Sequence, residues 1–186
     1  YKIDKTKNEL LELANSTKDL LEKIIEPILE NNYGTELSNI DSHNPQLWEY
    51  GHVLFFIEKH ALRHIVVYKY PLNKNINNDI YDSYQINSKD RRNAVMAPLE
   101  QLKKYKDYLF DYIVDLLNNP VNITSNHINY MIHFVLLHAH MHIESFLFTN
   151  QMVYKQLPSC FEYLKLNEPK NLLKDKLIFI NGGTFI

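Results

Sequence analysis

Four long stretches of this 186-residue chain repeat their apolar residues at intervals of three and four positions. The first covers residues 6–29, where leucine and isoleucine are interspersed with charged residues, and the others cover about 46–68, 98–117 and 124–154. This spacing places the apolar residues on one side of an α-helix, so each stretch is expected to form an amphipathic helix. Asparagine, proline or glycine follows each stretch and ends it. Four such helices predict an all-α fold, an up-and-down four-helix bundle.

The connections differ in length, and the last part of the chain has another pattern. Residues 72–93 are rich in Asn, Asp and Ser and lack a helical period, which predicts a long loop of the kind that is usually functional or disordered. After Pro158 a polar stretch leads to 177–186, whose apolar run and Gly-Gly pair are typical of a strand and a turn. We therefore expect a bundle over 1–157 and a C-terminal extension over 158–186, consisting of a linker and the first strand of a second domain.

Charge and composition argue against several kinds of partner. Twenty basic and 22 acidic side chains give a formal net charge of -2, and no Lys/Arg run has the density that binds nucleic acid or anionic membranes. No apolar stretch approaches the roughly 18 residues of a membrane span. Cys160 is the only cysteine, so an intramolecular disulfide is impossible and a reducing, cytoplasmic setting is expected.

The chain has nine histidines, and three of them lie within residues 137–144. On a helix, His138 and His142 lie within about 40° of each other on the face expected to meet the bundle, whereas His140 points to nearly the opposite side. Two interpretations are open: the pair is held in the core by hydrogen bonds, or it shares a metal ion. Adjacent imidazoles in an apolar core need partners for their ring nitrogens, and a metal ion provides one.

His52, on the second predicted helix, is the candidate for a third ligand, although a lone histidine there would more often be structural. Three neutral histidines leave the charge of a dipositive ion intact and leave positions open for substrate and water, as catalytic metal sites require. The pattern differs from the zinc-protease motif, because Ala139 stands where His-Glu-x-x-His has glutamate. The remaining histidines are expected to be surface, capping or interface residues: His43, His60, His64, His127, His133 and His140.

Two motifs carry a resemblance to a known family. The segment Asn44–His52 reads NPQLWEYGH, is followed by Phe56 and Glu58, and resembles the N-terminal motif of the ergothioneine- and ovothiol-type non-haem iron sulfoxide synthases. The segment His138–Glu144 reads HAHMHIE and is similar to the His-x-x-x-His-x-Glu motif of the same family.

Two further segments agree with this resemblance. Tyr81–Tyr84, with Arg91 and Arg92 after it, is similar to the loop that follows the second helix in those enzymes. Ile178–Phe185 resembles the opening strand of the sulfatase-modifying-factor-like domain, related to the formylglycine-generating enzyme, that comes next in the family. The resemblance therefore covers nearly the whole chain, in the family's order.

The resemblance implies a DinB-like helix bundle in which His52, His138 and His142 bind iron(II). It implies an oxidoreductase that uses O2 to join a thiol, of the cysteine or γ-glutamylcysteine type, to an imidazole carbon of a histidine derivative, with oxidation of the sulfur to the sulfoxide. In this family the second domain supplies a catalytic tyrosine and most of the pocket for the histidine substrate. No catalytic residue is therefore assigned to this chain, which is expected to bind metal without turning over alone.

Three more residues match the family's pattern. Arg91 or Arg92 is expected to pair with a carboxylate of the thiol substrate, because a guanidinium fork suits a carboxylate; a solvated basic pair in a loop is the alternative. Glu144 matches the second motif but lies about 240° around the helix from His138, so it is not expected to be a ligand. A contact with the second domain is its expected role.

Two other functions are compatible with the same residues. DinB-like metal-dependent thiol transferases also use three histidines, usually with zinc or nickel, and there the ion lowers a thiol pKa and no O2 is consumed. A non-catalytic structural or interaction bundle is the third function, and a large exposed apolar face would favour it. The Asn-Pro-x-x-Trp lead-in and the Gly-Gly-Thr-Phe tail favour the synthase, and hence iron.

Overall fold

The computed structural model describes residues 5–30, 43–64, 78–119 and 126–154. Every regular element in these ranges is helical and none is a strand, so the all-α prediction is confirmed. No helix in the described ranges combines the length and the apolar character that crossing a membrane requires. The predicted C-terminal extension, 158–186, lies outside these ranges.

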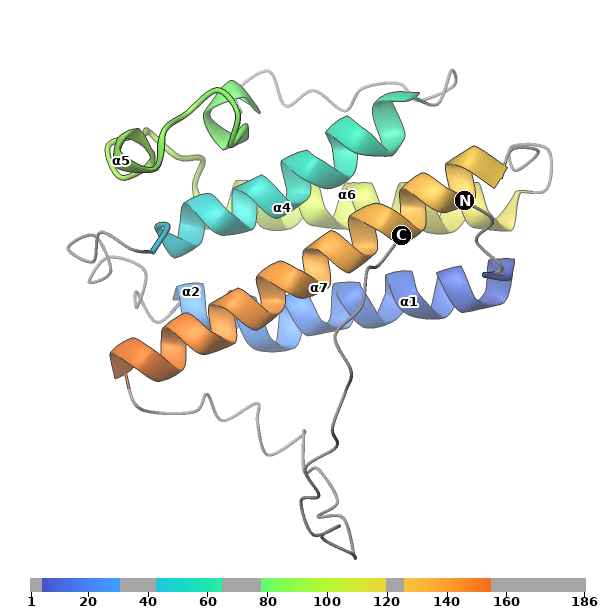
Figure 1. The fold of residues 1–186 in the computed structure, drawn as a ribbon. Helices are drawn as coiled ribbons and strands as arrows, with labels where there is room; N and C mark the ends of the chain where they lie inside the picture. The colour runs from blue at the N-terminus through green and yellow to red at the C-terminus, as the bar shows by residue number, and fades with distance from the viewer. Residues whose placement is uncertain (1–4, 31–42, 65–77, 120–125, 155–186) are drawn as a thin grey trace, which may run out of the picture.

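Four long helical elements pack side by side as a bundle (Figure 1). They are α1 (Lys7–Leu20) with its continuation through η1 (Leu21–Ile25) and α2 (Glu26–Glu30), α4 (Gln46–His60), α6 (Leu99–Asn118) and α7 (Asn126–Tyr154). Both α1 and α4 contact α6 and α7, so the order around the bundle is α1, α6, α4, α7. The second helix is shorter than predicted, because it ends at His60 and is followed by the short η3 (Leu62–His64).

Neighbouring helices do not strictly alternate in direction. The Lys7 ammonium donates to the Asn118 carbonyl at 3.4 Å, and Lys103 pairs with Glu30, so α1 and α6 are antiparallel. In contrast, α4 and α6 run the same way along the bundle (Figure 1). A strict up-and-down order would make these two helices antiparallel, and the long connection between them permits the parallel arrangement instead.

The first helix begins with a capping box and contains one wider turn. The Thr6 hydroxyl accepts from the backbone N–H of Glu9, and the Glu9 carboxylate accepts from the N–H of Thr6. The turn at η1 is a π-helix, in which the Glu26 N–H bonds to the Leu21 carbonyl five residues back. Pro27 follows directly. It has no N–H to donate, and in a regular α-helix its ring would clash with the carbonyl of the residue four positions earlier, which accounts for the wider turn before it.

A strap of residues 78–92 covers part of α4 (Figure 1). It contains η4 (Asn78–Tyr81) and α5 (Ser88–Arg91), and it lies within the predicted loop 72–93. Because α4 packs against the bundle and also carries the strap, 11 of its 15 residues are buried. This explains why the sequence of α4 is apolar on several faces.

A buried ion-pair network joins three of the helices in the core. The ammonium of Lys106, on α6, lies 2.7 Å from Glu26 Oε1 and 2.8 Å from Glu22 Oε1, and the Lys106 side chain is 3% exposed. The Tyr50 hydroxyl, on α4, donates to the same Glu26 oxygen at 2.8 Å. The network fixes the positions of α4 and α6 relative to the π turn.

Candidate metal centre

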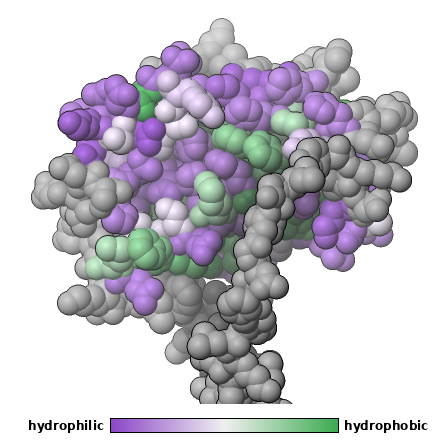
Figure 2. Space-filling view, in the orientation of Figure 1, coloured by the Kyte–Doolittle hydropathy of each residue, from purple (hydrophilic) through white to green (hydrophobic). Residues whose placement is uncertain are grey.

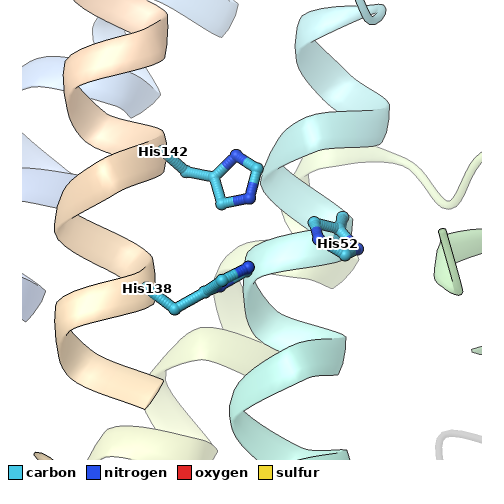
Figure 3. Close-up of side chains that lie close together, drawn as sticks. All are labelled: His52, His138 and His142. Atoms are coloured by element: carbon cyan, nitrogen blue, oxygen red, sulfur yellow. The ribbon is translucent and has the colours of Figure 1, made fainter. Parts of the chain in front are cut away.

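The three predicted ligands lie together where α4 crosses α7. Figure 3 shows His52 on α4 and His138 and His142 on α7, with the three rings pointing toward one another. One ring nitrogen from each lies within 4.8 Å of the other two, a group that can hold a metal ion. His52 is 5% exposed, and the other two are largely buried.

A carboxylate holds His142 in place. Its Nδ1 lies 2.7 Å from Glu49 Oε1, and the two side chains are 12% and 4% exposed. A carboxylate only accepts, so Nδ1 carries the hydrogen and the lone pair of His142 is on Nε2. A histidine held this way presents Nε2 to a metal, the arrangement found around many metal-bound histidines.

A backbone carbonyl holds His52 in the same way. Its Nδ1 lies 2.8 Å from the carbonyl oxygen of Tyr81, so Nδ1 donates and Nε2 is left with the lone pair. Tyr81 is itself fixed: its hydroxyl accepts from the Ala97 N–H at 2.9 Å, and its ring fills the space beside Gly51. The strap therefore orients one of the three candidate ligands.

Trp48 and Arg91 form a stack on His52. The indole of Trp48, a residue of α4, lies nearly parallel to the His52 ring, with 5.1 Å between the ring centroids. On Trp48, in turn, lies the guanidinium of Arg91, 4.2 Å from the centroid of the Trp48 ring. The indole N–H donates to the Ile80 carbonyl at 2.5 Å, which ties Trp48 to the strap. This aromatic and cationic packing restricts the movement of His52 and the access of water to it.

The predicted substrate-binding arginines both contact the protein itself. Arg91 donates to Asn44 Oδ1 at 2.9 Å and to the carbonyls of Ile86 and Ser83 at 3.2 and 3.3 Å. Arg92 donates to the backbone carbonyl of His43 at 3.2 Å. Arg91 is thus placed next to the histidine cluster through Trp48, and pairing of either arginine with a substrate stays a prediction.

His138 is packed differently from the other two histidines. The Phe56 ring stacks on it with a centroid distance of 3.5 Å and an interplanar angle of 9°. Its Nδ1 is buried and has no hydrogen-bond partner among the described residues. An unsatisfied buried polar atom lowers stability by about 1–3 kcal/mol. Hydrogen bonds among the described residues therefore do not satisfy all three histidines.

Burial keeps two of the histidines neutral. Burial lowers the pKa of His52 to about 4, with the hydrogen bond to Tyr81 acting in the opposite direction. Burial, followed by the charges of His142 and His52, lowers the pKa of His138 to about 3. Both rings are therefore unprotonated at neutral pH, the form in which imidazole binds a metal.

The donor set fits a first-row divalent ion. Three nitrogens bound at about 2.1 Å from one ion lie roughly 3–4 Å apart, so side-chain movements of about 1 Å would close the present cluster. Neutral imidazole suits zinc, iron and nickel, and three protein ligands leave coordination positions open. The arrangement can therefore bind a Lewis-acidic ion that remains accessible to small molecules.

His140 and Glu144, the other two residues of α7 considered in the sequence analysis, lie away from the three-histidine cluster. The Thr17 hydroxyl donates to the Leu13 carbonyl at 2.6 Å, so it accepts from Nε2 of His140 at 2.9 Å across the contact between α1 and α7. Glu144 is exposed. Neither residue contributes to the three-histidine group.

Sequence reasoning missed the residues that hold the ligands. Glu49 lies three residues before His52, among mostly apolar residues of the same helix. A carboxylate in such a place needs a buried partner. Gly51 is inside a helix, where glycine is costly, and such a glycine indicates a close approach by another part of the chain. Nothing in the sequence indicated that the carbonyl of Tyr81 would be that part.

Comparison with known proteins assigns no function to the three-histidine cluster. No family model matches the chain, and no curated protein is significantly similar to it. The structure itself shows an all-helical domain, consistent with a DinB-like fold, with three clustered histidines that can hold a metal ion.

Proposed function

We propose that this domain binds one divalent metal ion through His52, His138 and His142, as the iron-binding part of an iron(II)- and O2-dependent sulfoxide synthase. One observation carries the metal site: the histidines converge while Glu49 and Tyr81 hold two of them by Nδ1, which leaves Nε2 for an ion. Buried histidines that served only the core would use these nitrogens in hydrogen bonds to the protein.

The motifs around the site support iron and the synthase reaction. NPQLWEYGH and HAHMHIE supply all three histidines, and their resemblance is to enzymes that join a thiol to a histidine derivative. Iron(II), when bound, supplies the activation of O2 and a binding position for the thiol sulfur. The residues of this chain hold the ion and limit the access of water to His52 and His138 through the rings of Trp48 and Phe56. A sulfatase-modifying-factor-like second domain would complete the substrate pocket.

The test is metal content in variants of the three histidines. Protein purified without oxygen and reconstituted with Fe(II) should contain about one iron per chain, and His52→Ala, His138→Ala and His142→Ala should each lose it. His64→Ala, at an exposed position outside the cluster, is the matched control and should keep the iron. If the wild-type protein binds no metal specifically, the proposed metal site is wrong. If all variants contain as much iron as the wild type, the three histidines are not its ligands.

The thiol transferase differs from the synthase in the metal that supports its activity and in its use of O2. A transferase-type site would be active with zinc or nickel, would consume no O2 and would lower the pKa of a bound thiol. Because a set of imidazole ligands generally binds Zn(II) more tightly than Fe(II), the relative affinity for the two ions does not separate the two functions. Thiol-dependent O2 uptake by the Fe(II)-loaded protein, once the second domain is supplied, would favour the synthase. Thiol transfer with zinc and no O2 uptake with iron would favour the transferase.

One observation favours an interaction module as the second candidate. Five large apolar side chains lie along one face of α7 and are 41–57% exposed: Phe134, Leu137, Met141, Phe148 and Met152. Figure 2 shows hydrophobic groups on the face of the molecule that carries α7. Light scattering of the whole chain tests this function: self-association that Met141→Lys abolishes would favour it, and a monomer with bound iron would favour the synthase.

A further inference from the structure

We infer that Glu49 is a positioning residue of the metal centre, which aims Nε2 of His142 at the ion and offsets part of the ion's charge. This inference rests on the proposed metal site and assigns a role to a residue outside the three ligands. Glu49 belongs to α4 and His142 to α7, and the 2.7 Å contact between them joins the two helices beside the histidine cluster. Glu49 therefore acts on the ion only through His142.

The charge environment of Glu49 sets it apart from the other buried carboxylates. In the described ranges each of the others pairs with a lysine or an arginine: Glu26 with Lys106, Glu58 with Arg63, and Asp82 with Lys59. Among the residues that the structure describes, the Glu49 carboxylate forms a hydrogen bond with His142 alone. Arg91 interacts with Glu49 electrostatically, but its hydrogen bonds go to Asn44 and to backbone carbonyls.

A buried carboxylate is unfavourable unless a positive charge is close to it. A dipositive ion on Nε2 of His142 would put that charge on the opposite side of the imidazole ring from Glu49. The carboxylate, the imidazole and the ion would then form one electrostatic unit, in which Glu49 makes His142 a stronger donor. The ion would supply for Glu49 what Lys106 supplies for Glu26.

The three histidines are accordingly unequal in what holds them. His142 has a charged acceptor, His52 has the neutral carbonyl of Tyr81, and Nδ1 of His138 has no partner among the described residues. A carboxylate strengthens the donor capacity of an imidazole more than a carbonyl does, because it carries a full negative charge. His142 is thus the ligand whose affinity for the ion depends most on a neighbouring side chain.

Metal affinity in Glu49→Ala and Glu49→Gln separates positioning from charge. Removing such a partner typically weakens metal binding by about 10- to 100-fold, and we expect a loss in this range for Glu49→Ala. Glu49→Gln keeps an oxygen that can accept from Nδ1 but lacks the charge, so its loss should be smaller. Glu144→Gln makes the same change at an exposed carboxylate two residues from His142, and it should bind metal like the wild type.

Dissociation constants would be measured with Co(II) and Zn(II) by competition with a chromophoric chelator, using the whole chain. The absorption bands of bound Co(II) report the ligand field directly, and they should shift in Glu49→Gln even if the fold is unchanged. Equal affinities and spectra in wild type and Glu49→Gln would overturn the part of the role that depends on the charge of Glu49. Unchanged metal affinity in Glu49→Ala, with or without a lower unfolding temperature, would overturn the positioning role, because the contact with His142 would then be a structural hydrogen bond only. Wild-type protein that binds neither ion would instead overturn the metal centre itself.

Discussion

Tyr81 lies against Gly51 so closely that a β-carbon added to Gly51 would clash with Cε1 of the Tyr81 ring. The same tyrosine accepts the Nδ1 hydrogen of His52 through its backbone carbonyl. The absence of a side chain at Gly51 therefore lets the strap reach one of the candidate metal ligands.

We expect Gly51→Ala to destabilise the protein and to weaken metal binding. The clash with Tyr81 should cost about 1–3 kcal/mol, as overpacking does in other cores. Over most of that range the cost exceeds the gain of about 1 kcal/mol from the better helix propensity of alanine. Urea unfolding and metal titration measure the two effects. In a double variant, Tyr81→Ala removes the clashing ring, so the loss in stability should be smaller than the sum of the single losses. Additive losses would contradict the proposed contact.

The stability of the metal-free protein should fall as the pH decreases from about 6.5 to about 4. In this range the unfolded chain protonates its histidines, whereas His52 and His138 in the folded state, with pKa values of about 4 and 3, do not. The unfolded state therefore binds more protons, and lowering the pH favours it. The slope should be up to about 1.4 kcal/mol per pH unit from His52 and less from His138, which is more exposed to solvent.

Urea unfolding at several pH values in the presence of a chelator measures this slope. The His52→Ala variant should have a shallower slope between pH 6.5 and 4, because one of the two neutral histidines is gone. An unchanged slope would show that other groups determine the acid sensitivity. The exposed His64→Ala variant provides the matched comparison.

Replacing Lys106 should be among the most damaging single changes outside the metal centre. Lys106→Met leaves Glu26 buried without its cation, and breaking a buried pair in this way costs about 3–5 kcal/mol. Combining it with Glu26→Gln removes the uncompensated charge and should recover part of the loss. Lys18→Ala, which breaks a more exposed pair with Asp111, should cost less than about 1 kcal/mol. Chemical denaturation of the three variants measures these losses, and similar losses for Lys106→Met and Lys18→Ala would contradict the importance of burial.

Metal loading should stabilise the fold by an amount that grows with the logarithm of the free ion concentration. At a free ion concentration 1,000 times the dissociation constant, the gain is about 4 kcal/mol, and a chelator should reverse it. The His138→Ala variant should show little or no gain with the same ion. An equal rise in unfolding temperature for that variant would indicate that the metal binds elsewhere.

The helices and the histidine cluster were predictable because both depend on local periodicity. Apolar spacing located the helices, and the spacing of His138 and His142 placed them on one face of α7, with His52 added from the preceding motif. These inferences need only the geometry of a single helix and the assumption that helices pack through their apolar faces.

The residues that orient the cluster could not be predicted in the same way. Glu49 is 93 residues from His142, and Tyr81 is 29 residues from His52. Such contacts depend on how helices and loops are arranged in space, and the parallel course of α4 and α6 was likewise not visible in the periodicity (Figure 1). Nor could local pattern show that Arg91 would stack on Trp48.

The strap and the metal centre share one source of stability. Three consecutive strap residues are held by side chains of α4, since Ile80 accepts from Trp48, Tyr81 from His52 and Asp82 from Lys59. Local opening of the strap would release Nδ1 of His52 and leave the imidazole free to turn, so the open form would bind an ion more weakly. By thermodynamic reciprocity, a bound ion lowers the population of that open form. The backbone amides of residues 80–86 would then exchange their hydrogens with solvent more slowly as the ion binds, although none of them contacts it.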